Sequence, residues 1–300
     1  MTAVRGALHA VRSAPGPSMA AAVIVGLFLY ALVVPLFAAD PFRLSGMSIM
    51  DSFTPPVWME GGNPRFPLGA DDQGRNLLTA MAYGLRTSII VGVSSVLIGL
   101  VLGGALGLLS GFVGGRTDAV IMRIADVQLA YPALLLAMVI DGIATAVYGR
   151  ERSAGLAITI VIFAIGIALW VQFARTIRSS VMVERDHDYV AAALVTGRSK
   201  IAIVLQHILP NVMAPVLVIA TINLGIAIIT EATLSFLGIG IPLTHPSLGA
   251  LIRNGNAYLQ SGEWWISAWP CLVLVLLVIA VNVLGDHLRD HFNPKLRGRS

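Results

Sequence analysis

Six apolar stretches of about 20 residues divide the chain, and each is long enough to cross a bilayer as a helix. They lie at residues 19–39, 88–111, 124–147, 153–174, 208–230 and 264–285. With 56% hydrophobic and only 12% charged residues, the chain cannot cover a globular, water-facing surface. Backbone groups in hydrocarbon have to be satisfied within their own segment, which favours helices. The sequence therefore predicts an all-α integral membrane protein with six transmembrane helices.

Two of these stretches are ambiguous. Asp126 and Asp141 interrupt the stretch at 124–147, which makes it the weakest of the six. The stretch at 19–39 could be the apolar core of a signal peptide, but it is longer than the usual core of about 7 to 15 residues. No A-x-A cleavage pattern closes it either, so we interpret it as a retained span.

Lysine and arginine are unevenly divided between the two sides that six spans define. Of these 20 residues, 13 fall on the side of both termini and seven on the other. Because cationic residues accumulate in cytoplasmic loops, we place both termini in the cytoplasm. The predicted parts are a cytoplasmic tail at 1–18, a first helix at 19–39, a periplasmic loop at 40–86, a core at 87–287 and a cytoplasmic tail at 288–300. Within the core, the loop at 175–207 is cytoplasmic and the loop at 232–263 is periplasmic.

This topology also accounts for the net charge of +4, which could otherwise suggest binding to nucleic acid. We therefore predict no nucleic-acid partner. The C-terminal cluster Lys295, Arg297 and Arg299 leaves contact with membrane lipid headgroups open.

Catalytic and metal-binding motifs are missing from the sequence. A nucleotide-binding P-loop needs a lysine directly after a glycine, and neither Lys200 nor Lys295 has one. Cys271 is the single cysteine, so a C-x-x-C site is excluded. His287 and His291 have the spacing of helical metal ligands but lack an adjacent glutamate, and a solvated tail explains them better. We predict no catalytic residue and no metal site.

Glycines recur every four residues in the second stretch, at Gly99, Gly103, Gly107 and Gly111. This spacing lines them on one helix face and lets a second helix approach closely. We favour packing within the chain over a subunit interface.

Ionisable groups at membrane depth are costly unless paired or wetted, so they mark candidate functional positions. Asp141, Asn223 and Glu231 are the candidates for lining a path across the membrane. For Asp141 we favour a different interpretation, in which the helix ends there and the aspartate lies at the outer surface. A proton relay stays open.

The cytoplasmic loop at 175–207 is helical in character. It lacks proline, and its single glycine, Gly197, follows a run of alanines. We predict two short helices separated at Gly197, forming a polar insert suited to docking a soluble partner.

Five blocks, in this order, resemble one family. They read L-G-A-D-D-Q-G-R-N at 68–76, G-G-R-T-D at 114–118, D-Y-V-A-A-A at 188–193 with Gly197 and H-I-L-P-N at 207–211, E-A-T-L-S-F-L-G-I-G at 231–240, and N-V-L-G-D-H-L-R-D at 282–290. Together they are similar to permease subunits of binding-protein-dependent ABC importers, in the dipeptide, oligopeptide and nickel branch. In this branch two homologous permeases form a pair, and the sequence resembles the second of them, the C-type permease.

The resemblance implies a type I ABC importer permease in the bacterial inner membrane. Such a subunit pairs with a second, homologous permease, docks two ATP-binding subunits and receives solute from a periplasmic solute-binding protein. ATP and Mg²⁺ would be bound by the partner subunits, so no cofactor is expected in this chain. The implied ATPase-coupling residues are Tyr189, Ala191, Ala192, Ala193, Leu194, Gly197, Arg198, Ser199, Lys200 and Pro210, with Pro210 restarting the chain as the fifth span.

One departure from the family pattern affects this loop. Ala191 stands where relatives usually carry a glutamate, and Leu194 stands where an arginine is frequent. Docking would then depend on Tyr189, Leu194 and the backbone shape, with charge supplied by Asp186, Asp188, Arg198 or Lys200.

The resemblance implies di- or oligopeptides as the first choice of substrate, with nickel complexes, glutathione or opines as alternatives. Two other classes stay open. One is a proton-coupled secondary transporter that uses Asp141 or Glu231, and the other is a membrane scaffold without transport activity.

Overall fold

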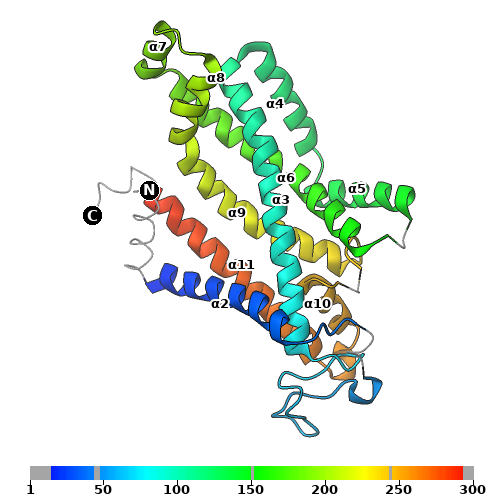
Figure 1. Cartoon of the computed structure of the whole chain (residues 1–300). Helices are drawn as coiled ribbons and strands as arrows, with labels where there is room; N and C mark the ends of the chain where they lie inside the picture. The colour runs from blue at the N-terminus through cyan, green and yellow to red at the C-terminus, as the bar shows by residue number, and fades with distance from the viewer. Residues whose placement is uncertain (1–14, 44–47, 150–151, 243–244, 293–300) are drawn as a thin grey trace.

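The computed structural model describes residues 15–43, 48–149, 152–242 and 245–292, and nearly all of its regular structure is helical (Figure 1). Most of the predicted tail at 1–18 lies outside the described residues. So does the part of the C-terminal tail that holds Lys295, Arg297 and Arg299.

Five helices are long and apolar enough to cross a membrane. They are α2 (Pro15–Phe37), α3 (Leu77–Val113), α6 (Ala154–Arg185), α9 (Leu209–Phe236) and α11 (Trp265–Phe292). α9 is extended at its start by α8 (Lys200–Ile203) and a π-helical turn η3 (Val204–Ile208), so this span runs from Lys200 to Phe236. α3 begins at Leu77, 11 residues before the apolar stretch that the sequence predicts from residue 88.

The third predicted span is wrong as a single helix. The chain forms α4 (Gly115–Leu129) and α5 (Ala133–Tyr148), which meet at an angle of 88°. Pro132 caps α5, and a residue before proline is disfavoured in the helical region, so the helix breaks at this point. The described residues thus contain five continuous spans, or six if the bent pair counts as one.

The long helices pack around α3. Figure 1 shows α3 running the length of the molecule beside α6 and α9, with α2 and α11 side by side on one flank and α5 projecting sideways. The largest buried cluster lies between α3, α6 and α9 and includes Phe173 and Ile165, which are almost fully enclosed. α7 (Asp188–Val195) lies at one end of the molecule, and α10 (Leu248–Asn256) lies toward the other.

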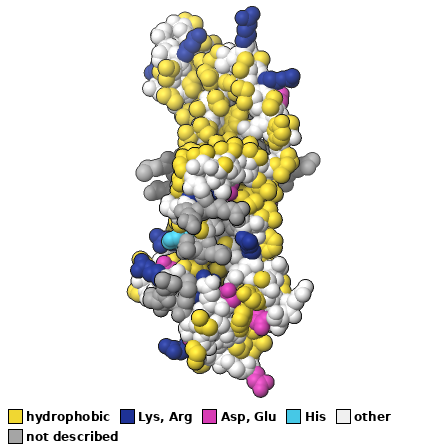
Figure 2. Space-filling view, turned by 90° about the vertical axis from the view of Figure 1, so that its right-hand side faces the viewer, with side chains coloured by type: hydrophobic (Ala, Val, Ile, Leu, Met, Phe, Trp, Pro, Cys, Tyr) yellow, Lys and Arg dark blue, Asp and Glu magenta, His cyan; other side chains and the backbone are white. Residues whose placement is uncertain are grey.

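The surface between these ends is apolar. On the face in Figure 2, hydrophobic side chains cover most of the upper half below a tip that carries Lys and Arg side chains, whereas acidic side chains lie mainly in the lower part, together with further basic ones. Many large apolar residues point outward from the long helices, including Phe28, Val101 and Ile279. An apolar exterior between polar ends is the pattern expected of a protein immersed in a bilayer.

The glycine face of α3 packs on α6 within the same chain. All four glycines, Gly99, Gly103, Gly107 and Gly111, are buried. A Cβ at Gly103 would lie only 2.3 Å from the carbonyl oxygen of Trp170, and one at Gly107 only 2.6 Å from that of Ala174. Hydrogen at these positions is therefore what allows the two backbones to approach so closely.

This packing predicts a position-specific effect of a single methyl group. We expect Gly103→Ala to destabilise the protein by about 1 to 3 kcal/mol, because the two helices have to separate to admit the side chain. The adjacent Gly104 is the matched control, since a Cβ there meets its nearest neighbour, the Ile177 side chain, at 3.7 Å. Unfolding in mixed micelles measures both variants, and equal stability of the two would contradict this account of the α3–α6 contact.

Candidate functional site

The cytoplasmic loop of the sequence analysis forms a helix, a sharp turn and a second helix at one end of the molecule. α7 covers Asp188–Val195, and α8 starts at Lys200. The turn is a Schellman motif, in which Gly197 N–H donates to the Leu194 carbonyl at 3.0 Å and Arg198 N–H donates to the Ala193 carbonyl at 3.2 Å. Gly197 has φ +76°, a left-handed conformation that glycine adopts without steric cost.

α7 has a buried face and an exposed face. Val190 and Ala193 are buried against the spans. Ala191, Ala192, Leu194 and Val195 are exposed, and Leu194 and Val195 are 46% and 89% accessible. Two large aliphatic side chains thus stand free at the tip of the molecule, beside two alanines that leave the backbone open to close approach.

Tyr189 points back into the chain instead of outward. Its hydroxyl donates to Glu184 Oε2 at 2.6 Å, and the Asn211 side-chain amide donates to the Tyr189 oxygen at 3.2 Å. The Tyr189 ring also stacks on the His207 ring, with centroids 6.4 Å apart. Burial, followed by the hydrogen bond to Glu184, raises the pKa of Tyr189. These contacts tie α7 to the end of α6 and to the start of α9.

Sequence reasoning gave Tyr189 a docking role and did not identify Glu184, Asn211 or His207 as its partners. Two of these partners, His207 and Asn211, stand at the ends of the H-I-L-P-N block, so a signal was present. The spacing of residues in the sequence does not predict that Asn211 pairs with Tyr189, which lies 22 positions earlier.

The remaining predicted coupling residues shape the turn and the start of the span. Ser199 caps α8 by accepting from Ala202 N–H at 3.3 Å, and Arg198 Nη1 donates to Gln206 Oε1 at 2.8 Å. Lys200 is exposed. Pro210 stands in the first turn of α9, as predicted for the start of this span, but α8 and the π-helical turn extend the span back to Lys200.

At the same end, Asp118 fastens α3, α4 and α6 together. Its carboxylate accepts hydrogen bonds from Ser110 Oγ on α3 and from the Arg178 guanidinium on α6. Arg185 Nη1 donates to the Gly111 carbonyl at 3.1 Å nearby. The G-G-R-T-D block therefore holds the corner between α3 and α4 against α6.

Asp141 forms a buried ion pair that the sequence analysis did not predict. α5 continues through Asp141 to Tyr148, so the predicted helix end at Asp141 is wrong. Its Oδ1 binds Arg152 Nη2, and the same nitrogen donates to the Gly240 carbonyl at 3.3 Å. These groups border a cavity of about 540 Å³ between α5, the start of α6 and the segment after α9.

Asn223 and Glu231 lie elsewhere on α9 and are fully buried. Glu231 accepts hydrogen bonds from Ser88 Oγ at 2.8 Å and Ser235 Oγ at 2.7 Å, and Ser88 Oγ accepts from Leu248 N–H at the start of α10. Neither amide atom of Asn223 has a hydrogen-bond partner within the described chain. Among the described residues, no hydrogen bond joins any two of the three candidate path residues.

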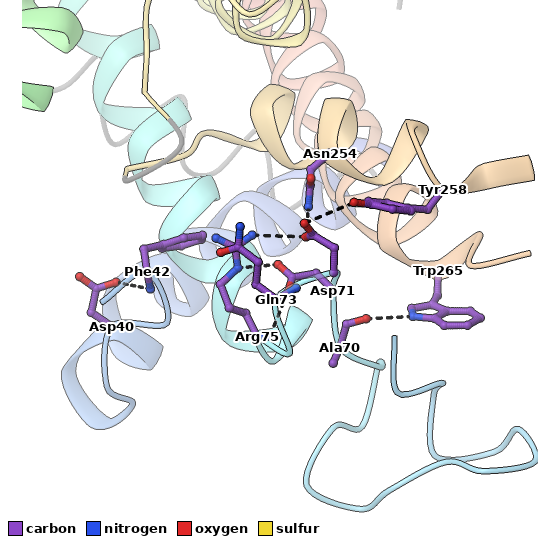
Figure 3. Close-up of polar contacts among 10 residues, drawn as sticks. Asp40, Phe42, Ala70, Asp71, Gln73, Arg75, Asn254, Tyr258 and Trp265 are labelled. Carbon is purple, nitrogen blue, oxygen red and sulfur yellow. Dashed lines mark hydrogen bonds and ion pairs between the residues drawn. The ribbon is translucent and has the colours of Figure 1, made fainter. Parts of the chain in front are cut away.

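The other end of the molecule is organised around the L-G-A-D-D-Q-G-R-N block, drawn in Figure 3. Arg75 Nε donates to Asp71 Oδ2 at 2.6 Å, and its guanidinium lies 4.9 Å from the centre of the Phe42 ring. Asp71 and Arg75 are both buried, and burial raises the pKa of the Asp71 carboxyl even though Arg75 opposes this. In the sequence this block carries only a resemblance to the family, and its ion pair and ring contact were not predicted.

The segment around Asp71 and Arg75 also contacts α10 and α11. The Asn254 amide donates to Asp72 Oδ1 at 2.7 Å, and Trp265 Nε1 donates to the Ala70 carbonyl at 3.2 Å (Figure 3). The negative charge of Asp72 raises the pKa of Tyr258. The two predicted periplasmic loops therefore form one folded surface.

The comparison with known families fits this arrangement. Residues 99–298 match the family described as "Binding-protein-dependent transport system inner membrane component". The chain belongs to this family. Its members are permease subunits, which form the membrane component of ABC transporters and are not catalytic, so the resemblance found in the sequence is confirmed.

Characterised relatives match most of the chain. The di/tripeptide transport system permease protein DppC of Pseudomonas aeruginosa (strain UCBPP-PA14) is 41% identical over 244 residues, which cover 81% of this chain and 77% of the relative. The glutathione transport system permease protein GsiD of Pectobacterium atrosepticum is 33% identical, over 92% of this chain and 87% of the relative.

A solved structure supports the predicted fold. The MetNI methionine ABC transporter, in an inward-facing conformation, aligns with a TM-score of 0.56 at 18% identity and covers 72% of this chain and 97% of the matched chain. At this identity the likeness concerns the fold alone. It confirms the predicted type I ABC importer permease fold for this multi-pass membrane protein.

Proposed function

We propose that this permease subunit forms, with a second homologous permease, the path by which short peptides enter the cytoplasm across a bacterial inner membrane. A periplasmic solute-binding protein delivers the peptide, and two ATPase subunits that bind ATP and Mg²⁺ drive the cycle. The observation that carries the proposal is the geometry of α7, a short helix with an exposed apolar face and a firmly anchored back.

The α7 geometry supports a lever. Leu194 and Val195 are free to enter a groove of a soluble partner. Tyr189 transmits displacement to Glu184 on α6 and Asn211 on α9 through direct hydrogen bonds. When two ATPases close around nucleotide, a helix held in this way moves with them and shifts both spans.

The missing family glutamate at Ala191 has a consistent explanation under this proposal. The anchoring carboxylate is Glu184, which faces Tyr189 and Asn211 from the end of α6. The exposed face of α7 is then left to apolar contacts with the ATPase, where Ala191 and Leu194 replace a charged pair.

In this proposal, the solute-binding protein docks on the folded surface at the α10 end. It joins the segment after α2 with α10 and the start of α11 through Asp72, Ala70 and Asn254. Glu231 connects this surface to the interior of α9, because Ser88 forms hydrogen bonds both to Glu231 and to the first residue of α10.

Short peptides are the proposed substrate class because relatives covering most of the chain are named for di/tripeptide and glutathione transport. Nickel complexes and opines are the alternatives within the same mechanism. A proton-coupled transporter receives less support, because Asp141 is held by Arg152 and Glu231 is held by two serine hydroxyls.

Purification from native membranes tests the proposed assembly. A tagged form of this chain is expected to carry with it one second permease and two copies of ATPase subunits, and the complete set in vesicles is expected to accumulate a labelled dipeptide. Isolation of the chain as a homo-oligomer without an ATPase would contradict the proposal.

A further inference from the structure

The cavity beside Asp141 is bordered by both a buried carboxylate and a buried guanidinium. Its volume is about 540 Å³, within the range of about 300 to 1,000 Å³ that small-molecule sites occupy. Side-chain exposure is 7% for Arg152 and 12% for Asp141. Asp141 lies on α5 and Arg152 lies in the connection just before α6, so the turn of the chain between these two helices places the two charges together.

The hydrogen bonds of this pair are incomplete. Arg152 uses Nη2 for both Asp141 and the Gly240 carbonyl, whereas Nη1 is buried without a partner among the described residues. Asp141 pairs with Arg152 through Oδ1, and no hydrogen bond among the described residues uses Oδ2. An unpaired guanidinium nitrogen at such a depth costs free energy, so a site of this kind is satisfied when an anion binds.

The pair as a whole is electrically neutral, and this defines the ligand. A cavity with one positive and one negative group favours a solute that carries both charges at separate positions, as a free peptide does at its two termini. We propose that this cavity is a transient site for a small zwitterion, whose carboxylate pairs with Arg152 and whose ammonium group pairs with Asp141. The identification of that zwitterion as a short peptide depends on the proposed function.

Binding requires a small rearrangement. Nη1 is enclosed in this structure, so the guanidinium has to turn toward the cavity to meet a carboxylate. The contact that this turn breaks is the long one to Gly240, at 3.3 Å. Asp141 exchanges part of its bond to Arg152 for the ligand ammonium, so neither charge is left unpaired.

The rest of the lining suits side chains of varied shape. Met138, Ile239 and Ile241 supply an apolar surface, and methionine adapts readily to different neighbours. Gly142 and Thr145 on α5 keep one wall small. A site that recognises the two peptide termini and contacts the side chains only loosely would bind peptides of many sequences. Such binding is weak, as a site on a transport route requires.

The test uses the complete transporter in lipid nanodiscs, without nucleotide and without the solute-binding protein. Binding of L-alanyl-L-alanine, its C-terminal amide and its N-acetyl form is measured by saturation-transfer NMR. For the unmodified protein we expect the amide and the acetyl form each to bind about tenfold more weakly or worse than the free dipeptide, because each lacks one charged contact.

The variants assign each preference to its residue. Arg152→Gln is expected to abolish the preference for the free dipeptide over its C-terminal amide. Asp141→Asn is expected to abolish the preference for the free dipeptide over its N-acetyl form. Arg75→Gln is the matched control, since Arg75 is equally buried at 7% exposure and ion-paired but lies away from the cavity. It should keep both preferences. A purely structural role for the pair would weaken all three ligands equally.

The inference is overturned if the unmodified transporter shows neither preference, or if both preferences persist in Arg152→Gln and Asp141→Asn. The ligand comparison in the unmodified protein keeps the test valid even if a variant fails to assemble. ATP-driven uptake of the dipeptide by the same preparation separates the two claims. Uptake without the preferences refutes this site alone, whereas the preferences without uptake refute peptide import and leave the site.

Discussion

Replacing Gly197 with proline is expected to reduce solute uptake by the complete transporter to background, while the permease remains inserted and assembled. Proline fixes φ at about −65°, whereas Gly197 adopts a φ of +76°. Proline also has no N–H to donate to the Leu194 carbonyl. The substitution therefore breaks the Schellman turn, because proline can adopt neither this conformation nor this hydrogen bond. α7 then loses its fixed direction relative to the span that begins at Lys200.

The measurement combines uptake with ATP hydrolysis in the same vesicles. We expect basal hydrolysis to persist in Gly197→Pro, because the ATPases are separate polypeptides, while its stimulation by loaded binding protein disappears. Gly197→Asn is the control, since asparagine tolerates a left-handed conformation, keeps the N–H and has open space for its side chain. Near-normal uptake by the proline variant would refute the lever.

A charge on the exposed face of α7 is expected to have an effect of similar size. Ala192 is exposed between the buried residues Val190 and Ala193, so Ala192→Asp leaves the packing of α7 on the spans intact. If the ATPase groove covers this face, an unpaired buried charge there weakens docking by about 2 to 5 kcal/mol. Transport should then be lost together with co-purification of the ATPase.

Ala192→Ser is the matched control, because serine is nearly as small and carries no charge. Tagged Ala192→Ser should retain both the ATPase and uptake, whereas tagged Ala192→Asp should lose both. Normal recovery of the ATPase with the aspartate variant would show that α7 is not the docking element.

The apolar stretches predicted the spans well because a span is defined by length and hydrophobicity, which are properties of local sequence. The failure at 124–147 has the same origin. Hydropathy does not register a change of direction, and it averaged over Pro132, where the helix turns by 88°. The proline was visible, but its geometric consequence depended on α5 finding a surface on α6 and α9.

The turn at Gly197 was predictable since a single glycine at the end of an alanine-rich helix is a local signal. The partners of Tyr189 were not, because Glu184 and Asn211 approach it only after α6 and α9 are placed side by side. The pair between Asp141 and Arg152 was missed for a related reason. Arg152 lies in the connection between α5 and α6, and its position opposite Asp141 follows from the turn that the chain makes between these two helices.

The central claim is that this chain is a passive gate driven by ATPases bound at α7. The most direct measurement compares dipeptide accumulation by the purified chain alone in vesicles with that of the complete set, under an imposed proton gradient and with or without ATP. We predict uphill accumulation only for the complete set with ATP and loaded binding protein. Accumulation by the chain alone, driven by the proton gradient, would contradict the account.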